Sequence, residues 1–502
     1  MSKYFFFIII ITFLLFLNFF TNKVSASSYK NLIRKREEIV DNEPNSTEIF
    51  DDPDVNVLLN KTNLSNNESI IETETKELDI DPDAVMVLYV IRHGNRNPSK
   101  YFEENSLKRG WGEEGPLELN RRGKNEAFNF GVRLRHFLKG LIKRNFNSSE
   151  INLYTSSANR CQMTLQLISA AVFRPIGYGY WKDNLDWSPT PYTIDDEILR
   201  PYTKKCDAIE NSWNPIISEK LSEIEDIVSS NQDIINFFIR NGENFNFDKN
   251  RSFNDLANVA DNLHNYKIYR KPFPDFITKA NFSNYNSSTL IDKVMTFIEG
   301  SQIVCANDEK CGYLMGGRLL SHIKNELIKK ANETHNYPVK MIGYASHTEI
   351  VLSVMKLMGI DQNEIRTGCG FIIQLREKPF WSIKILKHNT IYQNNRLTGH
   401  SITIANYSKY LKNMSIGDGW IGLQNFTKFI QNKTIDNWEE ICPTCTKLKD
   451  IKHYEKSNIK ISGDTFNPKS ENLTLIANLG NQIYPLYNHL LIFLPIAIYI
   501  IL

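Results

Sequence analysis

A histidine flanked by two arginines carries the clearest chemical signal in the chain. Arg92, His93 and Arg96 follow directly after the apolar run of residues 84–91. Guanidinium groups offer paired N–H donors that match phosphate oxygens, and they stay charged at any physiological pH. An imidazole near neutral pH can act as a nucleophile or carry a proton. These residue types at this spacing predict a site that binds a phosphate group and attacks it.

Two later turns carry side chains suited to the same site. Arg160 follows the apolar segment 151–154 and a polar turn, and His347 and Glu349 follow the apolar segment 339–344. In open α/β sheets, ligands bind beyond the carboxyl ends of the strands. If the strands are parallel neighbours, their turns meet at one edge of the sheet. We therefore expect these three residues to join the first group.

The expected chemistry is transfer of a phosphoryl group to His93, which becomes a phosphohistidine. A carboxylic acid must protonate the leaving oxygen and can later activate the water that hydrolyses the intermediate, and Glu349 is the nearest candidate. As charge spreads over the phosphate oxygens in the transition state, they are held by Arg92, Arg96, Arg160 and a protonated His347. Since these groups supply the positive charge, no metal and no cofactor is expected.

Each residue also has a structural interpretation. A lone histidine at a strand end usually makes structural hydrogen bonds, and a lone arginine at a helix start is usually solvated, so neither His347 nor Arg160 identifies a site by itself. Glu349, in a first helical turn, can simply complement the helix dipole. A metal pair of His93 and His347 lacks a third ligand with usable spacing. The string R-H-G-N-R-N-P at residues 92–98 favours the functional interpretation.

The segments that must position these residues alternate between strands and helices. Helices are predicted over 118–139, from residue 160, and over 350–360; strands are predicted at 85–91, 151–154, 339–344, 369–376 and 381–386. This alternation predicts an α/β fold: a three-layer α/β/α domain with a mostly parallel sheet, over residues 84–450. Amphipathic stretches between about residues 200 and 333 predict an inserted, mainly helical cap subdomain.

The two ends of the chain predict passage through the secretory pathway. Residues 1–26 have a cationic start, an apolar run and a small-residue cleavage site, as a signal peptide does. Residues 27–83 are polar and acidic and predict a disordered lead-in. Residues 451–489 form a tail or spacer, and the apolar residues 490–502 favour a GPI signal or another terminal membrane anchor over a buried helix. N-glycosylation sequons begin at Asn45, Asn60, Asn147, Asn250, Asn332, Asn425 and Asn472.

Charge and cysteine content narrow the class of protein further. The formal net charge of +2 argues against nucleic acid as the main partner. The cysteines number seven, so at least one is unpaired within the chain. Cys305 with Cys311, and Cys442 with Cys445, are close enough in sequence for local disulfides. No partner is assigned to Cys161, Cys206 and Cys369.

These motifs together resemble the histidine acid phosphatases, the secretory branch of the histidine phosphatase superfamily. Residues 92–98 are similar to that family's RHGxRxP string, and residues 154–175 to its segment with a third phosphate-binding arginine, which is Arg160 here. Residues 315–320 resemble a Gly-Gly helix start, and residues 344–347 the approach to the second catalytic histidine. Cys442 and Cys445 resemble a late two-cysteine segment. The resemblance covers about residues 84–450 and implies an α/β domain with a helical cap and acid phosphomonoesterase activity.

The chain departs from the family pattern after its second histidine. Most members have Asp there, whereas this chain has Thr348 and then Glu349. A subgroup that acts on inositol polyphosphates has His-Ala-Glu, so the resemblance implies Glu349 as the proton donor. Residues 157 and 159 are Ser and Asn, where relatives often carry Asp. This departure puts the substrate class in question.

Three functions follow as expectations. The first is an acid phosphatase that hydrolyses phosphate monoesters, located outside the cell, on its surface or in the lysosome. The second is an inositol polyphosphate (phytase-like) phosphatase of the same fold, with cap cations at Lys204, Lys205, Arg270 and Lys271. The third is a non-catalytic phosphate-ester-binding surface protein. The expected partner is a small phosphate monoester, and homodimer formation is left open.

Overall fold

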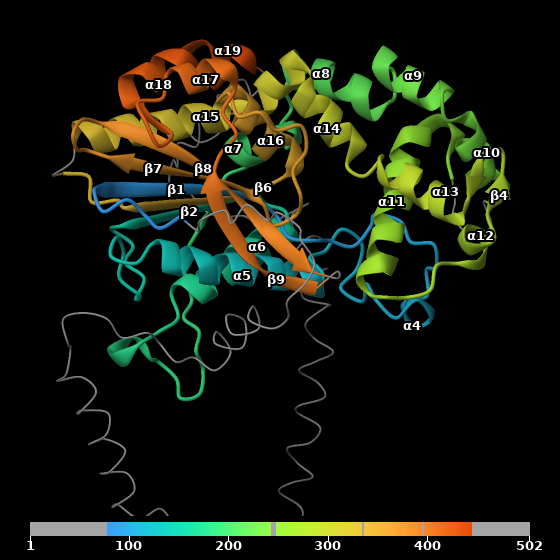
Figure 1. Ribbon diagram of the computed structural model, residues 1–502, viewed down its shortest axis with the longest axis horizontal. Coiled ribbons are helices and arrows are strands. Elements are labelled where there is room, and N and C mark those ends of the chain that lie inside the picture. Colours follow the sequence, from blue (N-terminus) through green and yellow to red (C-terminus); the bar gives the residue numbers. More distant parts are fainter. Residues whose placement is uncertain (1–77, 242–246, 334–335, 394–395, 444–502) are drawn as a thin grey trace, which may run out of the picture. The chain divides into compact units, whose positions relative to one another are not determined.

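The computed structural model describes residues 78–241, 247–333, 336–393 and 396–443 (Figure 1). All of them belong to the first of two compact units, Met1–Cys445. The predicted signal peptide, most of the lead-in, the spacer and the apolar tail lie outside the described residues. Within the described ranges, no helix has both the length and the apolar character required to cross a membrane.

An eight-stranded mixed sheet forms the centre of the fold, with strand order β10-β8-β7-β1-β6-β2-β3 and β9 paired with β8. The parallel strands are β1 (Ala84–Arg92), β6 (Met341–Ser346), β2 (Ile151–Thr155) and β3 (Thr193–Ile194). The antiparallel strands are β7 (Gly370–Arg376), β8 (Ser382–Gln393), β9 (Arg396–Ile404) and β10 (Trp420–Gly422). The parallel half contains every strand that precedes a predicted site residue.

Helices cover both faces of this sheet, so the predicted α/β fold class is confirmed. One face packs against α5 (Arg121–Phe137) and α6 (Asn159–Val172), and the other against α15 (Glu309–Asn332) and α16 (Thr348–Leu357) (Figure 1). Strand β1 alternates between two apolar clusters, because successive side chains of a strand point to opposite faces. Met86, Leu88 and Val90 join the cluster of α15 and α16, and Val87, Tyr89 and Ile91 join that of α5 and α6.

Residues 207–307 are mainly helical, in the region for which a cap is predicted. The helices are α8 (Asp207–Ile217), α9 (Ser222–Ser229), α10 (Gln232–Arg240), α11 (Ser252–Ile268), α12 (Asp275–Thr278), α13 (Ser287–Met295) and α14 (Gly300–Asn307), with a small hairpin of β4 (Asn281–Phe282) and β5 (Tyr285–Asn286). Helix α11 is not among the helices predicted from the sequence. The boundaries of the cap stay a prediction.

Shorter helical segments complete the described fold. They are α4 (Ser106–Arg109), α7 (Asp196–Leu199), α17 (Lys409–Asn413), α18 (Leu423–Ile430) and α19 (Trp438–Ile441), with 3-10 turns η2 (Gly177–Gly179), η3 (Pro201–Thr203), η5 (Lys249–Arg251) and η6 (Gln431–Lys433).

The predicted Gly-Gly helix start is wrong, since Gly316 and Gly317 lie in the interior of α15. A Cβ atom at Gly316 would stand 2.8 Å from the backbone nitrogen of Val354 in α16. The pair of glycines therefore allows two helices to approach closely and does not begin one. This approach fixes α16, which has the predicted site residue His347 as its N-cap and Glu349 in its first turn.

One of the two local disulfides predicted from cysteine spacing is confirmed and the other is wrong. Cys305 bonds to Cys311, as expected. Cys442 bonds to Cys206, which lies 236 residues away, and not to its near neighbour. The bridge joins the N-terminus of α8 to the end of α19, a contact that spacing along the chain cannot reveal. Cys161 and Cys369 are buried free thiols in the described part of the chain.

Candidate active site

The register of the parallel strands brings the predicted site residues to one edge of the sheet. Arg92 at the end of β1 is level with Ser346 at the end of β6, and Thr155 at the end of β2 is level with Ala345. The backbone N–H of His93 donates to the carbonyl of Ser346 at 2.9 Å. The ring centroids of His93 and His347 are 5.5 Å apart. The predicted convergence at the carboxyl ends of the strands is therefore present.

His93 is held in one orientation by its own loop. Its Nδ1 atom lies 2.8 Å from the carbonyl oxygen of Gly94, an acceptor only, so Nδ1 carries the proton and Nε2 keeps its lone pair. Burial, reinforced by Arg160 and Arg92, lowers the pKa of His93 well below its usual value. A neutral imidazole with an available Nε2 is the form that can attack phosphorus.

The loop of His93 packs directly on the start of α5. A Cβ atom at Gly94 would lie 2.7 Å from the Cα atom of Gly123, so only glycine permits this approach. The N–H of Gly94 donates to the hydroxyl of Thr164 in α6 at 3.1 Å, and the N–H of Asn95 donates to a carboxylate oxygen of Glu126 in α5 at 2.8 Å. Both helices of this face therefore hold the loop that contains His93.

Arg160 and His347 contact each other directly. Arg160 Nη2 donates to His347 Nδ1 at 3.2 Å, and His347 Nε2 lies 3.0 Å from the hydroxyl oxygen of Ser156. Because an arginine can only donate, Nδ1 accepts, and the proton of the neutral ring is on Nε2. Burial and the charge of Arg160 lower the pKa of His347 well below its usual value. Burial and Arg160 therefore favour the neutral form of His347 here, and its protonation with a bound phosphate stays a prediction.

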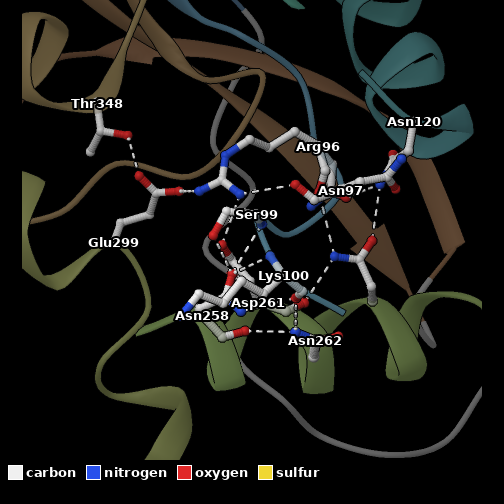
Figure 2. Close-up of polar contacts among 12 residues, drawn as sticks. Arg96, Asn97, Ser99, Lys100, Asn120, Asn258, Asp261, Asn262, Glu299 and Thr348 are labelled. Atoms are coloured by element: carbon white, nitrogen blue, oxygen red, sulfur yellow. Dashed lines mark hydrogen bonds and ion pairs between the residues drawn. The ribbon is translucent and has the colours of Figure 1, made fainter. Parts of the chain in front are cut away.

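Arg92 and Arg96 share the carboxylate of Glu299, which is not among the site residues predicted from the sequence. Arg92 Nη2 lies 3.0 Å from Oε1 of Glu299. Arg96 Nη2 lies 2.8 Å from the same oxygen (Figure 2). Arg96 Nη1 also pairs with Asp261 at 2.8 Å. Within the described residues, the buried Nε atom of Arg92 has no hydrogen-bond partner. Both arginines thus lie at the candidate site, and each guanidinium group is already paired with at least one carboxylate.

Glu299 immediately precedes α14 with its backbone in the left-handed region, at φ 55°. Its second oxygen, Oε2, accepts a hydrogen bond from the hydroxyl of Thr348 at 3.0 Å. Burial raises the pKa of Glu299, but Arg92 and Arg96 outweigh that effect, and the pKa falls to about 2. The carboxylate is therefore an anion at any working pH. No sequence signal distinguished it from other glutamates of the helical segment.

Glu349 is buried in the first turn of α16 and hydrogen-bonds with Tyr202. Burial is the main effect on this carboxyl group, and it raises the pKa above the ordinary value. The two glutamates therefore differ in the protonation state that their surroundings favour. Burial favours the protonated form of Glu349, whereas two arginines favour the anionic form of Glu299.

Helix α11 forms a polar platform under the loop that contains Arg96. Asn258 accepts from the backbone N–H groups of Ser99 and Lys100 at 3.0 and 3.1 Å, and Asn262 donates to the carbonyl of Lys100 at 2.8 Å (Figure 2). Asp261, between them in sequence, holds Arg96. One face of this helix is polar, at positions 258, 261, 262 and 265. This periodicity is present in the sequence, but it is not among the patterns from which the site was predicted.

The cap cations expected from the sequence, Lys204, Lys205, Arg270 and Lys271, are exposed. Other cations act on His264 of α11: burial and, after it, the charges of Arg122, Arg92 and Lys267 lower the pKa of this histidine to about 4.

Comparison with known proteins agrees with this geometry. The model of the histidine phosphatase superfamily (branch 2) matches residues 85–369, more than half of the chain. Lysosomal acid phosphatase of Bos taurus is 23% identical over 284 residues, which cover 56% of this chain and 63% of that protein. Prostatic acid phosphatase of Homo sapiens is 20% identical over 278 residues, covering 55% and 69%. The chain thus spans somewhat less than two thirds of the bovine relative's length.

Solved structures share the fold at low sequence identity. The phytase of Klebsiella sp ASR1 superposes with a TM-score of 0.50 at 12% identity, covering 71% of this chain and 96% of that one. The phytase of Hafnia alvei gives a TM-score of 0.47 at 11% identity, covering 70% and 97%. At such identities the likeness concerns the fold alone.

Proposed function

Because the chain belongs to branch 2 of the histidine phosphatase superfamily, we propose that it hydrolyses phosphate monoesters through a phosphohistidine intermediate. The observation that carries this proposal is the orientation of His93. Its Nδ1–H is committed to Gly94, and its Nε2 lone pair lies in a site that contains Arg92 and Arg160. Phosphoryl transfer requires mainly positioning and neutralisation of charge, and these residues supply both.

In the first step, Nε2 of His93 forms a bond to phosphorus as the bond from phosphorus to the ester oxygen breaks. Arg160 and the unpartnered Nε of Arg92 stabilise the charge that spreads over the phosphate oxygens. Binding of a phosphate dianion also favours protonation of His347, because a nearby negative charge raises the pKa of an imidazole. His347 then becomes the cation that the sequence predicted.

The leaving oxygen needs a proton, and Glu349 is the proposed donor. Its burial favours the protonated carboxylic acid, which is the form that a general acid must have. In the second step the resulting carboxylate accepts a proton from water as the water oxygen attacks phosphorus. The bond to His93 then breaks, inorganic phosphate is released, and Glu349 is again protonated.

A second candidate is the same chemistry on an inositol polyphosphate. Arg122 and Lys267 lie near enough to the site to act on His264 together with Arg92. Such cations fit additional phosphate groups of one substrate. The protein of Klebsiella sp ASR1 that shares the fold is a phytase. A third candidate, a surface protein that binds phosphate esters without turnover, keeps the arginines but not the reaction.

We also infer a secretory destination. Two disulfides join described cysteines, and disulfides persist in oxidising compartments. The matching relatives include a lysosomal and a prostatic acid phosphatase. The signal peptide, the glycans and the terminal anchor predicted from the sequence belong to the same proposal.

The test is hydrolysis by the purified protein at mildly acidic pH, with p-nitrophenyl phosphate and inositol hexakisphosphate assayed side by side. Turnover should be lost in His93→Ala, and a radiolabelled phosphoenzyme should be trapped in the wild type only. His136→Ala removes an exposed histidine from α5 and serves as the matched control. Turnover that survives in His93→Ala would sink the mechanism, and an inactive wild type that still binds phosphate would favour the third candidate.

A further inference from the structure

The carboxylate of Glu299 binds the two guanidinium groups that are predicted to hold phosphate oxygens. Oε1 lies 3.0 Å from Arg92 Nη2 and 2.8 Å from Arg96 Nη2, and both arginines belong to the string predicted to grip phosphate. A carboxylate and a phosphate present the same kind of acceptor to a guanidinium group. The two arginines therefore already have an anionic partner, the carboxylate of Glu299 from the predicted cap.

Glu299 is fixed at this place and cannot easily withdraw. Its φ of 55° is uncommon for a residue other than glycine, and its carbonyl accepts the N–H of Ile303 at 3.0 Å. A Cβ atom at the next residue, Gly300, would meet the ring of Phe253 at 2.6 Å, so the helix start is tightly packed. Thr348 binds the second carboxylate oxygen at 3.0 Å. A strained, pinned residue of this kind is often functional.

Several charged or titratable groups surround this carboxylate from every element near it. They are Arg92 and Arg96 after β1, Arg160 on α6, Asp261 on α11, and His347 and Glu349 around the start of α16. A bound phosphate dianion would compete with Glu299 for the same guanidinium groups and would repel it. Repulsion between anions at close range raises the pKa of a carboxyl group. Uptake of a proton by Glu299 removes the conflict without moving the backbone.

We propose that Glu299 determines which anions the site accepts, because binding of a phosphate dianion to Arg92 and Arg96 is coupled to uptake of one proton by Glu299. The neutral carboxyl group stays bound to Thr348 and can donate its proton in a hydrogen bond to the ligand. This inference rests on the proposed function, since it takes the two arginines as phosphate ligands. It makes substrate binding stronger as the pH falls, independently of the proton that Glu349 supplies for the reaction.

Sulfate is the probe that separates this effect from titration of the ligand, because sulfate remains a dianion across the working pH range. Isothermal titration calorimetry in buffers of different ionisation enthalpy gives the number of protons taken up on binding. The wild type should take up about one proton more than Glu299→Gln. At pH 5, uptake of a whole proton requires the pKa of Glu299 to rise from about 2 to above 5, so Glu299→Gln should bind sulfate about 10³-fold more tightly at this pH. Proton uptake by His93 is common to both proteins and cancels. Because Glu299 raises the pKa of His347, the two proteins are compared with His347→Asn added to each.

Asp255→Asn is the control, since Asp255 is a buried carboxylate of α11 that pairs with Lys100 outside this cluster. It should keep the proton count of the wild type. Equal counts in wild type and Glu299→Gln, or weaker sulfate binding in Glu299→Gln, would overturn the proposal and leave Glu299 as a support for the arginines. If Glu299→Gln does not fold, Glu299→Ala is measured in its place. The readout needs no turnover, so it is distinct from a failure of the phosphohistidine mechanism.

Discussion

The hydroxyl group of Thr348 donates a hydrogen bond of 3.0 Å to Oε2 of Glu299. Thr348 occupies the position where most of the resembling phosphatases have aspartate. An aspartate here would place a second carboxylate against Glu299, which is already fixed by two arginines. The threonine of the uncommon His-Thr-Glu sequence therefore suits the buried Glu299, because its hydroxyl group donates to the carboxylate and does not repel it.

This relationship predicts the outcome of restoring the common residue. Thr348→Asp alone should lower the free energy of unfolding by about 1–3 kcal/mol, because a buried hydrogen bond is replaced by repulsion between carboxylates. The double variant Thr348→Asp with Glu299→Gln should recover most of that loss, since the amide can donate to the new carboxylate. Chemical denaturation of the four proteins gives the coupling energy directly. Additive effects would show that the two side chains act independently.

Replacing the proposed donor predicts a dependence on the leaving group. Glu349→Gln keeps the shape of the side chain but has no proton to give, so a poor leaving group such as an alkyl alcohol should lose about 10²–10⁴ in kcat/KM, which reports formation of the phosphoenzyme. p-Nitrophenolate needs little protonation and should lose much less in kcat/KM. A plot of log kcat/KM against leaving-group pKa should be steeper for the variant than for the wild type. Parallel lines would place the donor elsewhere.

The pH profile follows from the same two residues. His93 must be neutral to attack, and its pKa lies well below 6.5, so the acidic limb should fall at low pH. Glu349 must be protonated, and burial raises its pKa above 4.5, so activity should fall as the pH rises through that raised value. Comparing wild type and Glu349→Gln on one substrate cancels the ionisation of the phosphate ester, at about 6. The alkaline limb should weaken in the variant; an unchanged limb would contradict this assignment.

The sequence predicted the sheet edge well, because local patterns specify it. The apolar runs before His93 and His347 are strands β1 and β6, and Asn120, which caps α5 through the N–H of Gly123 at 3.0 Å, explains why that helix begins at Arg121 and not at the predicted residue 118. Strand, turn and helix each leave a short-range signature in the chain. The order of these turns was therefore sufficient to identify most of the site.

What the sequence did not predict depends on contacts between distant segments. Glu299 reaches Arg92 across more than two hundred positions, and Cys206 reaches Cys442 across 236. Nothing in the composition around these residues marks their partners. Helix α11 is a different case, since its polar face is periodic, but buried asparagines resemble a solvated surface until the loop that they bind is known.

The long-range disulfide predicts a measurable contribution to stability. Cys206→Ser with Cys442→Ser should lower the free energy of unfolding by about 2–5 kcal/mol, because the bridge restricts a long segment of the unfolded chain. The paired change avoids leaving a reactive thiol. Non-reducing peptide mapping should find the Cys206–Cys442 peptide in the wild type. A peptide that joins Cys442 to Cys445 would instead support the local disulfide predicted from the spacing of the two cysteines.

The platform of α11 predicts how a residue remote from phosphorus affects substrate binding. Asn258 accepts hydrogen bonds from both the backbone and the hydroxyl group of Ser99 and donates to the carbonyl of Lys100 at 2.9 Å. Asn258→Ala leaves these buried groups without partners, which should cost about 1–3 kcal/mol of stability. The loosened loop carries Arg96, so KM should rise more than kcat falls. Asn129→Ala is the control and should change neither value, because this partly exposed side chain donates to the carbonyl of Asn125 within α5 itself. An unaltered KM in Asn258→Ala would mean that the hydrogen bonds of Asn258 are not needed to hold Arg96, and that Asp261 and Glu299 alone position its guanidinium group.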